Sequence, residues 1–328
     1  MGFNKENYRR IRAEFETKTF RAQEEADARR AELYTQIPAV REMDTQLSQF
    51  GLRIMKCALE NKDMAGQIEK LHAENERILR ERGALLKRHG YPEDYSEPKY
   101  ECEKCKDTGY VDIKMCDCMR HALIEAGMRS SGLSMLITKQ SFDNFSLDYY
   151  KDSPKDRSMM ESHYRNLRYY AETFALDAAH PIPRNLLLFG GTGLGKTHLS
   201  TAIARVVIEK GYDVYYNSAV GMISDFEYRR FGNAIASDGG DDTSKYTECD
   251  LLIIDDLGTE VVNQFTLSCL YHVINTRINL QKPMIINTNL LSADIRKIYT
   301  DRLSSRLLGE FLQVPFFGTD VRSQRLKT

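Results

Sequence analysis

The chain has 328 residues, 42% of them hydrophobic and 28% charged, which is typical of a globular protein long enough for two or three domains. A net charge of −1 excludes a general attraction to nucleic acid or membrane surfaces, so any DNA contact requires a local basic patch. No run of about 18 apolar residues predicts a membrane span, and the charged N-terminus lacks the apolar core of a signal peptide. We therefore expect a cytoplasmic protein with no membrane partner.

Residues 4–88 are predicted to form two long polar helical stretches, with Pro38 in the first turn of the second. The first stretch has a weak apolar stripe at Tyr8, Ile11, Phe15 and Leu33. The second has residues alternately three and four positions apart, the spacing of one coiled-coil seam on a long helix. Two interpretations stay open, a hairpin or arm that packs on a partner and a plain oligomerising coiled coil. The seam comprises Val40, Met43, Leu47, Phe50, Ile54, Cys57, Asn61, Met64, Ile68, Leu71, Asn75, Ile78, Arg82 and Leu85.

Residues 89–101 contain two prolines and no periodicity, so they are predicted to be a linker. Four of the seven cysteines follow within 17 residues, in the pattern C-x2-C-x10-C-x-C. Crowded cysteines in a long cytosolic chain favour metal binding over disulfides. Two close pairs on a short hairpin, turned at Gly109, can place four thiolates around one structural Zn²⁺. The predicted ligands are Cys102, Cys105, Cys116 and Cys118.

Alternatives to zinc at this cluster are an iron–sulfur cluster, which the C-x2-C spacing disfavours, and a redox pair. His121 is a substitute ligand that four cysteines make unnecessary. The three remaining cysteines, Cys57, Cys249 and Cys269, are interpreted as packing residues.

Residues 121–180 are predicted to be mostly helical, with a loop over 138–154. From residue 181 short apolar strands alternate with helices, which predicts a parallel sheet covered on both faces. Helices are expected over 197–211 and 264–280. The expected strands are residues 185–189, 212–217, 251–256, 283–289 and 311–317.

Between the first of these strands and the following helix lies a match to the phosphate-loop pattern G-x-x-x-x-G-K-[ST]. Its glycines allow successive N–H groups to face phosphates, and the helix N-terminus adds its positive dipole end. Lys196 would reach the β- and γ-phosphates, and the Thr197 hydroxyl would ligate Mg²⁺. The predicted ATP-binding residues are Gly190, Gly191, Thr192, Gly193, Leu194, Gly195, Lys196, Thr197 and His198.

Two further strands end in polar side chains. Asp255 and Asp256 follow a buried strand, and ligands of open α/β sheets bind at that end. We expect Asp255 to hold Mg²⁺, directly or through water, and Asp256 to orient or deprotonate the attacking water. Asn289 ends the next strand and is predicted to sense the γ-phosphate, with a simple turn residue as the alternative.

Arginines near the C-terminus offer planar, permanently charged partners for phosphate. Arg306 is predicted to be a finger that reaches the nucleotide of a neighbouring subunit, and Arg302 a salt-bridge partner or second contact. A solvated helix face is the alternative for both. Arg322 is the candidate for a second sensor in the same chain.

The motif set resembles the ATPase domain of DnaC/DnaI-type helicase loaders and of the related IstB transposition ATPases. The resemblance covers about residues 135–328 and rests on GGTGLGKTHL, LLIIDDLGTE, IINTNL, DRLSSRLL and FGTDVRSQR, with SFDNFSLDYY before the core. It implies a P-loop AAA+ domain with a five-stranded parallel sheet. It also implies that Lys196, Thr197, Asp255, Asp256, Asn289 and Arg306 take the family's roles, with Arg322 the least secure match.

Asp256 stands where many AAA+ proteins have Glu, which implies slow or partner-dependent hydrolysis. The resemblance further implies single-stranded DNA on a helical insertion at residues 219–246, where cations and aromatics alternate. A helix with a basic edge packed on the core is the alternative. The candidate DNA contacts are Phe226, Tyr228, Arg229, Arg230 and Phe231.

Four regions are expected: a coiled-coil region at 1–95, a zinc module at 96–125, a helical lead-in at 126–180 and an AAA+ domain at 181–328. DnaI-type loaders are similar in having a helical, zinc-bearing N-terminal module that binds the helicase. The favoured hypothesis is therefore a self-assembling ATPase that loads a hexameric replicative helicase onto single-stranded DNA, using ATP, Mg²⁺ and Zn²⁺. The alternatives are an IstB-like regulator of transposition on duplex DNA and a non-enzymatic adaptor.

Overall fold

The structure is a computed structural model that describes residues 3–60, 64–133, 135–150, 153–176, 184–231 and 243–325. The chain divides into two compact units, Arg12–Met119 and a larger one that joins Met1–Ile11 to Arg120–Thr328. The four-region division expected from the sequence stays a prediction, although the helices and the cysteine cluster fall within one unit here. Among the described residues, no helix is long and apolar enough to cross a membrane.

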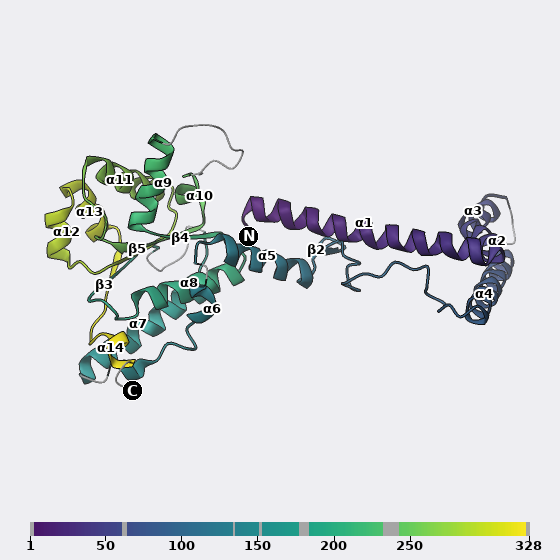
Figure 1. Cartoon of the computed structure of the whole chain (residues 1–328), viewed down its shortest axis with the longest axis horizontal. Helices are drawn as coiled ribbons and strands as arrows, with labels where there is room; N and C mark the ends of the chain where they lie inside the picture. Colours follow the sequence, from purple (N-terminus) through teal and green to yellow (C-terminus); the bar gives the residue numbers. More distant parts are fainter. Residues whose placement is uncertain are drawn as a thin grey trace. The chain divides into compact units, whose positions relative to one another are not determined.

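A five-stranded parallel sheet forms the centre of the larger unit, in the strand order β4-β5-β6-β3-β7 (Figure 1). Because all strands run the same way, their carboxyl ends meet along one edge. The predicted parallel sheet is confirmed, and each expected strand is present. The strands are β3 (Leu186–Phe189), β4 (Val214–Ser218), β5 (Leu251–Leu257), β6 (Met284–Thr288) and β7 (Leu312–Pro315).

Helices cover both faces of this sheet, since successive side chains of a strand point to opposite faces. Leu186 and Leu188 are buried in a cluster with α7 and α8, and Leu187 in a second cluster with α9, α11 and α13. The predicted two-sided burial is confirmed. The helices of this unit are α5 (Asp117–Ser130, from Arg120 onward), α6 (Leu136–Lys139), the 3-10 turn η1 (Leu147–Tyr149), α7 (Pro154–Glu172), α8 (Lys196–Glu209), α9 (Ala219–Phe231), α10 (Lys245–Glu248), α11 (Gln264–Asn279), α12 (Ser292–Ile298), α13 (Asp301–Gly309) and α14 (Val321–Arg325).

The start of α1 (Lys5–Gln36) is anchored on the larger unit. The Asn4 amide donates to the Asp213 carboxylate at 3.0 Å, and the Asn7 amide donates to the Ser130 hydroxyl at 2.7 Å. The Asn4 side chain also accepts from the backbone N–H of Asn7, which caps the first turn of α1. The first residues of the chain thus belong to the larger unit and not to the helical unit.

The smaller unit contains the rest of α1, with α2 (Pro38–Ser48), α3 (Phe50–Glu60) and α4 (Met64–Arg88). The expectation of one long helix over residues 40–85 is wrong, because α4 packs back against α2 and α3. The Phe50 and His72 rings lie 5.3 Å apart, and Arg53 pairs with Glu74 at 2.9 Å. The alternating three- and four-residue spacing therefore serves an antiparallel pairing within one chain. Asn61 and the side chain of Cys57 lie outside the described residues.

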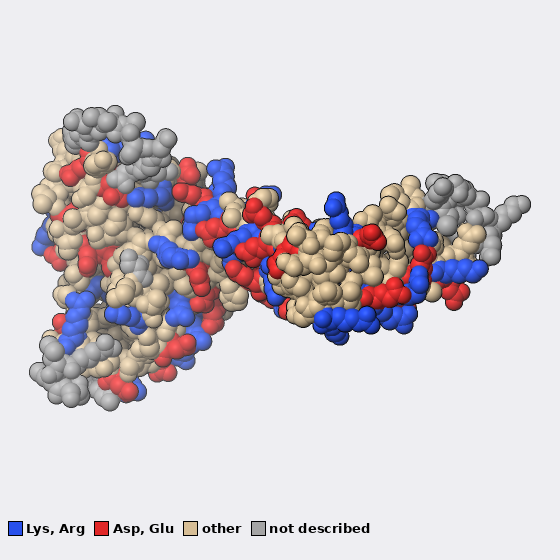
Figure 2. Space-filling view, turned by 45° about the vertical axis from the view of Figure 1, so that its right-hand side comes forward, with Lys and Arg blue, Asp and Glu red and all other residues tan. Residues whose placement is uncertain are grey.

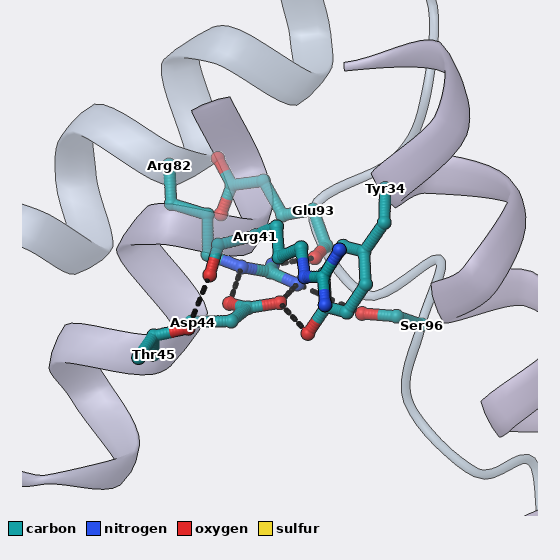
Figure 3. Close-up of polar contacts among 7 residues, drawn as sticks. All are labelled: Tyr34, Arg41, Asp44, Thr45, Arg82, Glu93 and Ser96. Carbon is teal, nitrogen blue, oxygen red and sulfur yellow. Dashed lines mark hydrogen bonds and ion pairs between the residues drawn. The ribbon is translucent and has the colours of Figure 1, made fainter. Parts of the chain in front are cut away.

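A polar cluster joins α1, α2, α4 and the segment after α4 (Figure 3). The Arg82 guanidinium points toward Asp44, with Nε 2.6 Å from its carboxylate, and the two side chains are 14% and 17% exposed. Arg82 also donates to the Ser96 hydroxyl at 2.8 Å, and the Tyr34 hydroxyl donates to Asp44 at 3.0 Å. The predicted linker is therefore held against the helices, and Arg29 of α1 adds two bonds to its backbone.

Candidate functional site

The phosphate loop lies between β3 and α8, at the carboxyl edge of the sheet (Figure 1). Gly193 and Gly195 adopt φ values of 73° and 83°, in the left-handed region that favours glycine. A Cβ on Gly193 would lie 1.8 Å from the Asp320 carboxylate, so the C-terminal segment packs directly on the loop. The Val321 N–H donates to the Gly193 carbonyl at 3.1 Å. Both glycines are thus needed for this loop geometry.

Lys196 begins α8 and its ammonium is turned into the loop. Its Nζ donates to the carbonyls of Gly190 and Gly191, both at 2.7 Å, and to the Asn289 side-chain oxygen at 2.8 Å. Burial lowers the pKa of Lys196 to about 8. An anion beside this ammonium would replace those neutral acceptors and favour the charged form. The structure therefore brings Lys196 and Asn289 together, as the two predicted phosphate contacts require.

Asp255 is 3% exposed and is held by three side chains at the end of β5. It accepts hydrogen bonds from the Thr197 hydroxyl at 3.0 Å, the Tyr216 hydroxyl at 2.6 Å and the Asn287 amide at 2.9 Å. Thr197 and Asp255 are the two predicted magnesium ligands. Hydroxyl and carboxylate oxygens are ligands that Mg²⁺ accepts, so this pair fits such an ion.

Asp256 lies at a break in the pairing of β5 with β6, where the register shifts between Ile254 and Leu257. Its φ of 52° is left-handed, and such bulges re-aim a side chain beside a site. Burial and the neighbouring Asp255 raise the pKa of Asp256. The carboxylate lines the pocket above the phosphate loop, where the predicted water-activating role requires it.

The pocket above the phosphate loop is also lined by residues that the sequence analysis did not assign to it. All but Val321 of α14 come from the segment between α6 and α7, which is anchored on the loop because the Tyr150 hydroxyl donates to the Leu194 carbonyl at 2.7 Å. His198, a predicted ATP contact, packs edge-on against the Phe145 ring, and its Nε2 lies 2.8 Å from the Ser141 carbonyl. The lining residues missed are Gln140, Asn144, Phe145, Ser146, Tyr149, Tyr150 and Val321.

Two supporting side chains of Asp255, Tyr216 and Asn287, were also missed. The Asn287 amide donates to Asp255 and to the Ser200 hydroxyl at 2.8 Å, and so ties β5 to α8. Asn287 is fully buried within the apolar strand β6. An asparagine inside such a strand is a signal for a polar partner across the sheet, because buried amides need hydrogen bonds.

The predicted arginines differ in where they lie. Arg322 of α14 lines the pocket with Lys196 and Asp256. Arg306 of α13 is absent from the described lining residues and stacks over the Tyr271 ring of α11 at 5.9 Å. Arg322 is thus placed to act within its own chain, whereas Arg306 is separated from that chain's own pocket.

The region predicted to touch DNA is only partly available for it. Phe226 is half-buried and packs against Tyr246, at the edge of the core cluster. Tyr228, Arg229 and Arg230 are exposed, with Arg230 over the Phe265 ring. The Phe231 side chain lies outside the described residues. Basic and acidic side chains are interspersed on the face drawn in Figure 2, in keeping with the near-zero net charge.

The cysteine cluster is built on the hairpin of β1 (Tyr110–Val111) and β2 (Lys114–Met115). The four sulfurs all lie within 4.8 Å of one another, with Cys102 and Cys116 at 3.8 Å and Cys105 and Cys118 at 3.4 Å. Tetrahedral zinc with Zn–S bonds of about 2.3 Å needs sulfurs about 3.8 Å apart, so the donor set fits.

The backbone around the four thiols is preorganised. The buried Asp107 carboxylate accepts from the N–H groups of Glu101 and Cys102 at 2.9 and 2.8 Å. A backbone hydrogen bond from Cys105 lowers the pKa of Cys102 to about 7, while burial raises the pKa of Cys105. A cation would favour all four as thiolates.

The two described cysteines outside this cluster are buried packing residues, as expected. Cys249 lies 3.3 Å from the Arg277 guanidinium, and burial raises its pKa to about 11. Cys269 lies in the cluster beneath α11. The expectation for Cys57 concerns a side chain outside the described residues.

Comparisons with known proteins show what the larger unit is similar to. A sequence model of the family described as IstB-like ATP binding protein matches residues 174–323. The chain is 32% identical over 139 residues to the chromosomal replication initiator protein DnaA of Aliarcobacter butzleri, across 42% of this chain and 31% of that protein. It is 29% identical over 117 residues to an insertion sequence ATP-binding protein of Sinorhizobium fredii, across 36% of this chain and 38% of that protein.

Among solved structures, the crystal structure of the DnaC helicase loader is similar with a TM-score of 0.43 and 20% identity, covering 54% of this chain and 98% of that chain. The chain spans about a third of the length of the curated relatives it matches. The family match includes the phosphate loop and the strands that end in Asp255 and Asn289.

The recognition from motifs is confirmed at the level of this domain, and so is the predicted fold class of a P-loop AAA+ domain with a five-stranded parallel sheet. Residues 174–323 are therefore an IstB-like ATP-binding domain of the AAA+ class.

Proposed function

We propose that the chain is an ATP-hydrolysing switch that loads a hexameric replicative helicase onto single-stranded DNA. One observation carries this proposal. Lys196, Asp256, Asn289 and Arg322 line one pocket, while Arg306 lies on α13, outside that lining. The nucleotide site of one chain is therefore suited to receive Arg306 from a neighbouring copy, as in ATPases that assemble side by side.

The residues have separate tasks in ATP hydrolysis to ADP and phosphate. Backbone N–H groups of the phosphate loop and Lys196 would bind the β- and γ-phosphates, and Thr197 and Asp255 would hold Mg²⁺. The ion would neutralise charge on the phosphates. Asp256 would orient the attacking water, and Asn289 would contact the γ-phosphate. The hydrogen bond between Asn289 and Lys196 in this structure supports a place for Asn289 beside the γ-phosphate.

The helical unit is proposed to bind the helicase, and its four cysteines to hold a structural Zn²⁺. The donor geometry supports zinc, since four sulfurs within 4.8 Å can fill a tetrahedral shell. Tyr228, Arg229 and Arg230 are the exposed candidates for single-stranded DNA, because stacking and cationic groups suit bases and backbone. This activity belongs in the cytoplasm, where the helicase and its DNA are found.

A second candidate is favoured by the family match itself. The matching family is described as IstB-like, and one relative is an insertion sequence ATP-binding protein. An ATPase that assembles on duplex DNA and regulates transposition would use the same nucleotide site.

Mass photometry separates the two functions. The full chain is mixed with the replicative helicase of its host, with ATP and Mg²⁺, and Lys196→Ala serves as the nucleotide-binding control. A defined complex with the helicase, weakened in the control, supports the loader. Assemblies on duplex DNA, with no helicase complex under any nucleotide condition, would overturn it in favour of the transposition regulator.

A further inference from the structure

A buried carboxylate follows the two aspartates of β5 and takes no part in the proposed chemistry. Glu260 is 7% exposed and accepts a hydrogen bond from the Gly258 N–H at 2.8 Å. Its other oxygen accepts a hydrogen bond from the Tyr299 hydroxyl. A buried carboxylate is costly unless its hydrogen bonds are strong, so this pair must join its two segments firmly.

The first segment is the turn that links Asp256 to Gly258. The Asp256 carbonyl accepts from the Thr259 N–H at 3.2 Å and from its hydroxyl at 2.8 Å. Gly258 has a φ of 102°, and a Cβ there would lie 2.6 Å from the Leu290 side chain. Leu290 follows Asn289 directly. The turn is therefore in close contact with both strand ends that line the nucleotide pocket.

The second segment is the start of α13. Tyr299 is 3% exposed and precedes Thr300, whose hydroxyl caps α13 by accepting from the Leu303 N–H. The Tyr299 ring packs in the same cluster as Leu257 and Leu307. Burial and the nearby Glu260 raise the pKa of Tyr299, so the phenol stays protonated and donates. Arg306 lies on this helix.

We propose that Glu260 and Tyr299 are positioning residues that couple nucleotide binding to the placement of α13, and so to Arg306. This inference rests on the proposed ATP-dependent function. A γ-phosphate would replace Asn289 as the partner of the Lys196 ammonium. Any resulting shift of the turn between Asp256 and Gly258 would pass through Glu260 to the first turn of α13. Packed cores transmit such shifts because they deform little.

Hydrogen exchange on the full chain tests the coupling. The probe is the non-hydrolysable analogue adenosine 5′-(β,γ-imido)triphosphate with Mg²⁺. In the unmodified chain, peptides over 190–198 and over 300–309 should both exchange about threefold or more slowly with the analogue. In Tyr299→Phe, the protection of 190–198 should stay within about twofold, because the pocket is untouched, while the response of 300–309 is lost.

Tyr246→Phe is the matched control. It removes the hydroxyl of another buried tyrosine, which donates to the half-buried Asp225 carboxylate and, among the described residues, makes no hydrogen bond to α13. A comparable fall in melting temperature with an unchanged response of 300–309 would separate coupling from stability. Glu260→Ala should also lose the response, and adding Tyr299→Phe should cause no further loss, because the two residues act as one unit.

A full response of 300–309 in Tyr299→Phe would overturn the coupling. So would protection of 190–198 without any response of 300–309 in the unmodified chain, although the ATP site would then stand. Absence of protection at 190–198 would overturn both the ATP site and the coupling. A failure to bind the helicase would reject the loader alone.

Discussion

The two units of this chain are stabilised in different ways. In the ATPase unit, alternating side chains of five strands fill two large apolar clusters, and the buried Lys196, Asp255 and Asn287 lie at the nucleotide edge. In the helical unit, the apolar cluster of Leu33, Ile37, Val40 and Leu86 is small and is supplemented by the Arg82–Asp44 pair and four thiols. Single polar residues should therefore decide ligand binding in one unit and stability in the other.

Lys196→Ala should have the largest effect and should be confined to ATP binding. Removal of the ammonium leaves the phosphates without their buried cation, so we expect affinity to fall by about a hundredfold or more. Titration with a fluorescent ATP analogue measures the loss. Lys210→Ala, at the C-cap of α8 and so at the opposite end of that helix, is the control. A hydrogen bond to a charged group typically contributes about 1.5–3 kcal/mol. An affinity within twofold of the unmodified chain would therefore refute the site.

Arg306→Ala should separate binding from hydrolysis. An arginine finger supplies about a thousandfold in turnover, so hydrolysis at saturating ATP should fall by that order while affinity is kept. Arg296→Ala on the neighbouring helix α12 is the control. The check is phosphate release measured over a range of protein concentrations, since a finger in trans acts only in the assembly. Unchanged turnover in saturated Arg306→Ala would remove Arg306 from the mechanism.

Cys105→Ser should affect the helical unit alone. One Zn²⁺ per chain should be lost, because three thiolates and a hydroxyl hold zinc poorly. ATP affinity should stay within about twofold, since the cysteine cluster and the pocket belong to different compact units. Mass spectrometry of bound metal gives the answer, with Cys269→Ser in the ATPase unit as the control. Equal zinc in both variants would contradict the four-cysteine site.

Arg82→Ala should weaken the helical unit through a single ion pair. Asp44 would remain largely buried, with the neutral Tyr34 hydroxyl as its remaining donor among the side chains of Figure 3. This loss should cost about 2 kcal/mol after allowance for partial exposure. Native-state hydrogen exchange of α4 reports that free energy of opening. Arg77→Ala breaks the exposed Arg77–Glu81 pair and should cost less than about 0.5 kcal/mol. Equal losses of stability in Arg82→Ala and Arg77→Ala would contradict this difference between the largely buried and the exposed ion pair.

The smallest effect should come from pH. Burial lowers the pKa of Lys196 to about 8, so the free protein loses this charge as the pH rises through that value. Phosphate binding restores the proton, and ATP affinity should therefore fall by up to about tenfold per pH unit above pH 8 and be flat below about pH 7. Calorimetry in buffers of different ionisation enthalpy should detect proton uptake at pH 8.5. Proton release there would contradict the assignment.

Where a motif holds its residues within one short stretch, the structure brings the predicted residues together. The phosphate loop and the cysteine pairs were recognised because residue spacing fixes which groups a turn or hairpin brings together. The supporting residues were not, since Tyr216 lies 39 positions from Asp255 and Asn287 lies 32. Long-range hydrogen bonds of this kind leave no periodic trace in the sequence.

The sequence by itself determined the elements and their chemistry: five strands with polar carboxyl ends, the phosphate loop between strand and helix, and four crowded thiols. The tertiary structure decided the fold-back of α4 on α2 and α3, because alternating three- and four-residue spacing suits a partner from the same chain as well as one from another. It also decided that Arg322 lines the pocket while Arg306 does not, and that Glu260 meets Tyr299. These outcomes depend on how packed elements meet across the core, which local spacing does not encode.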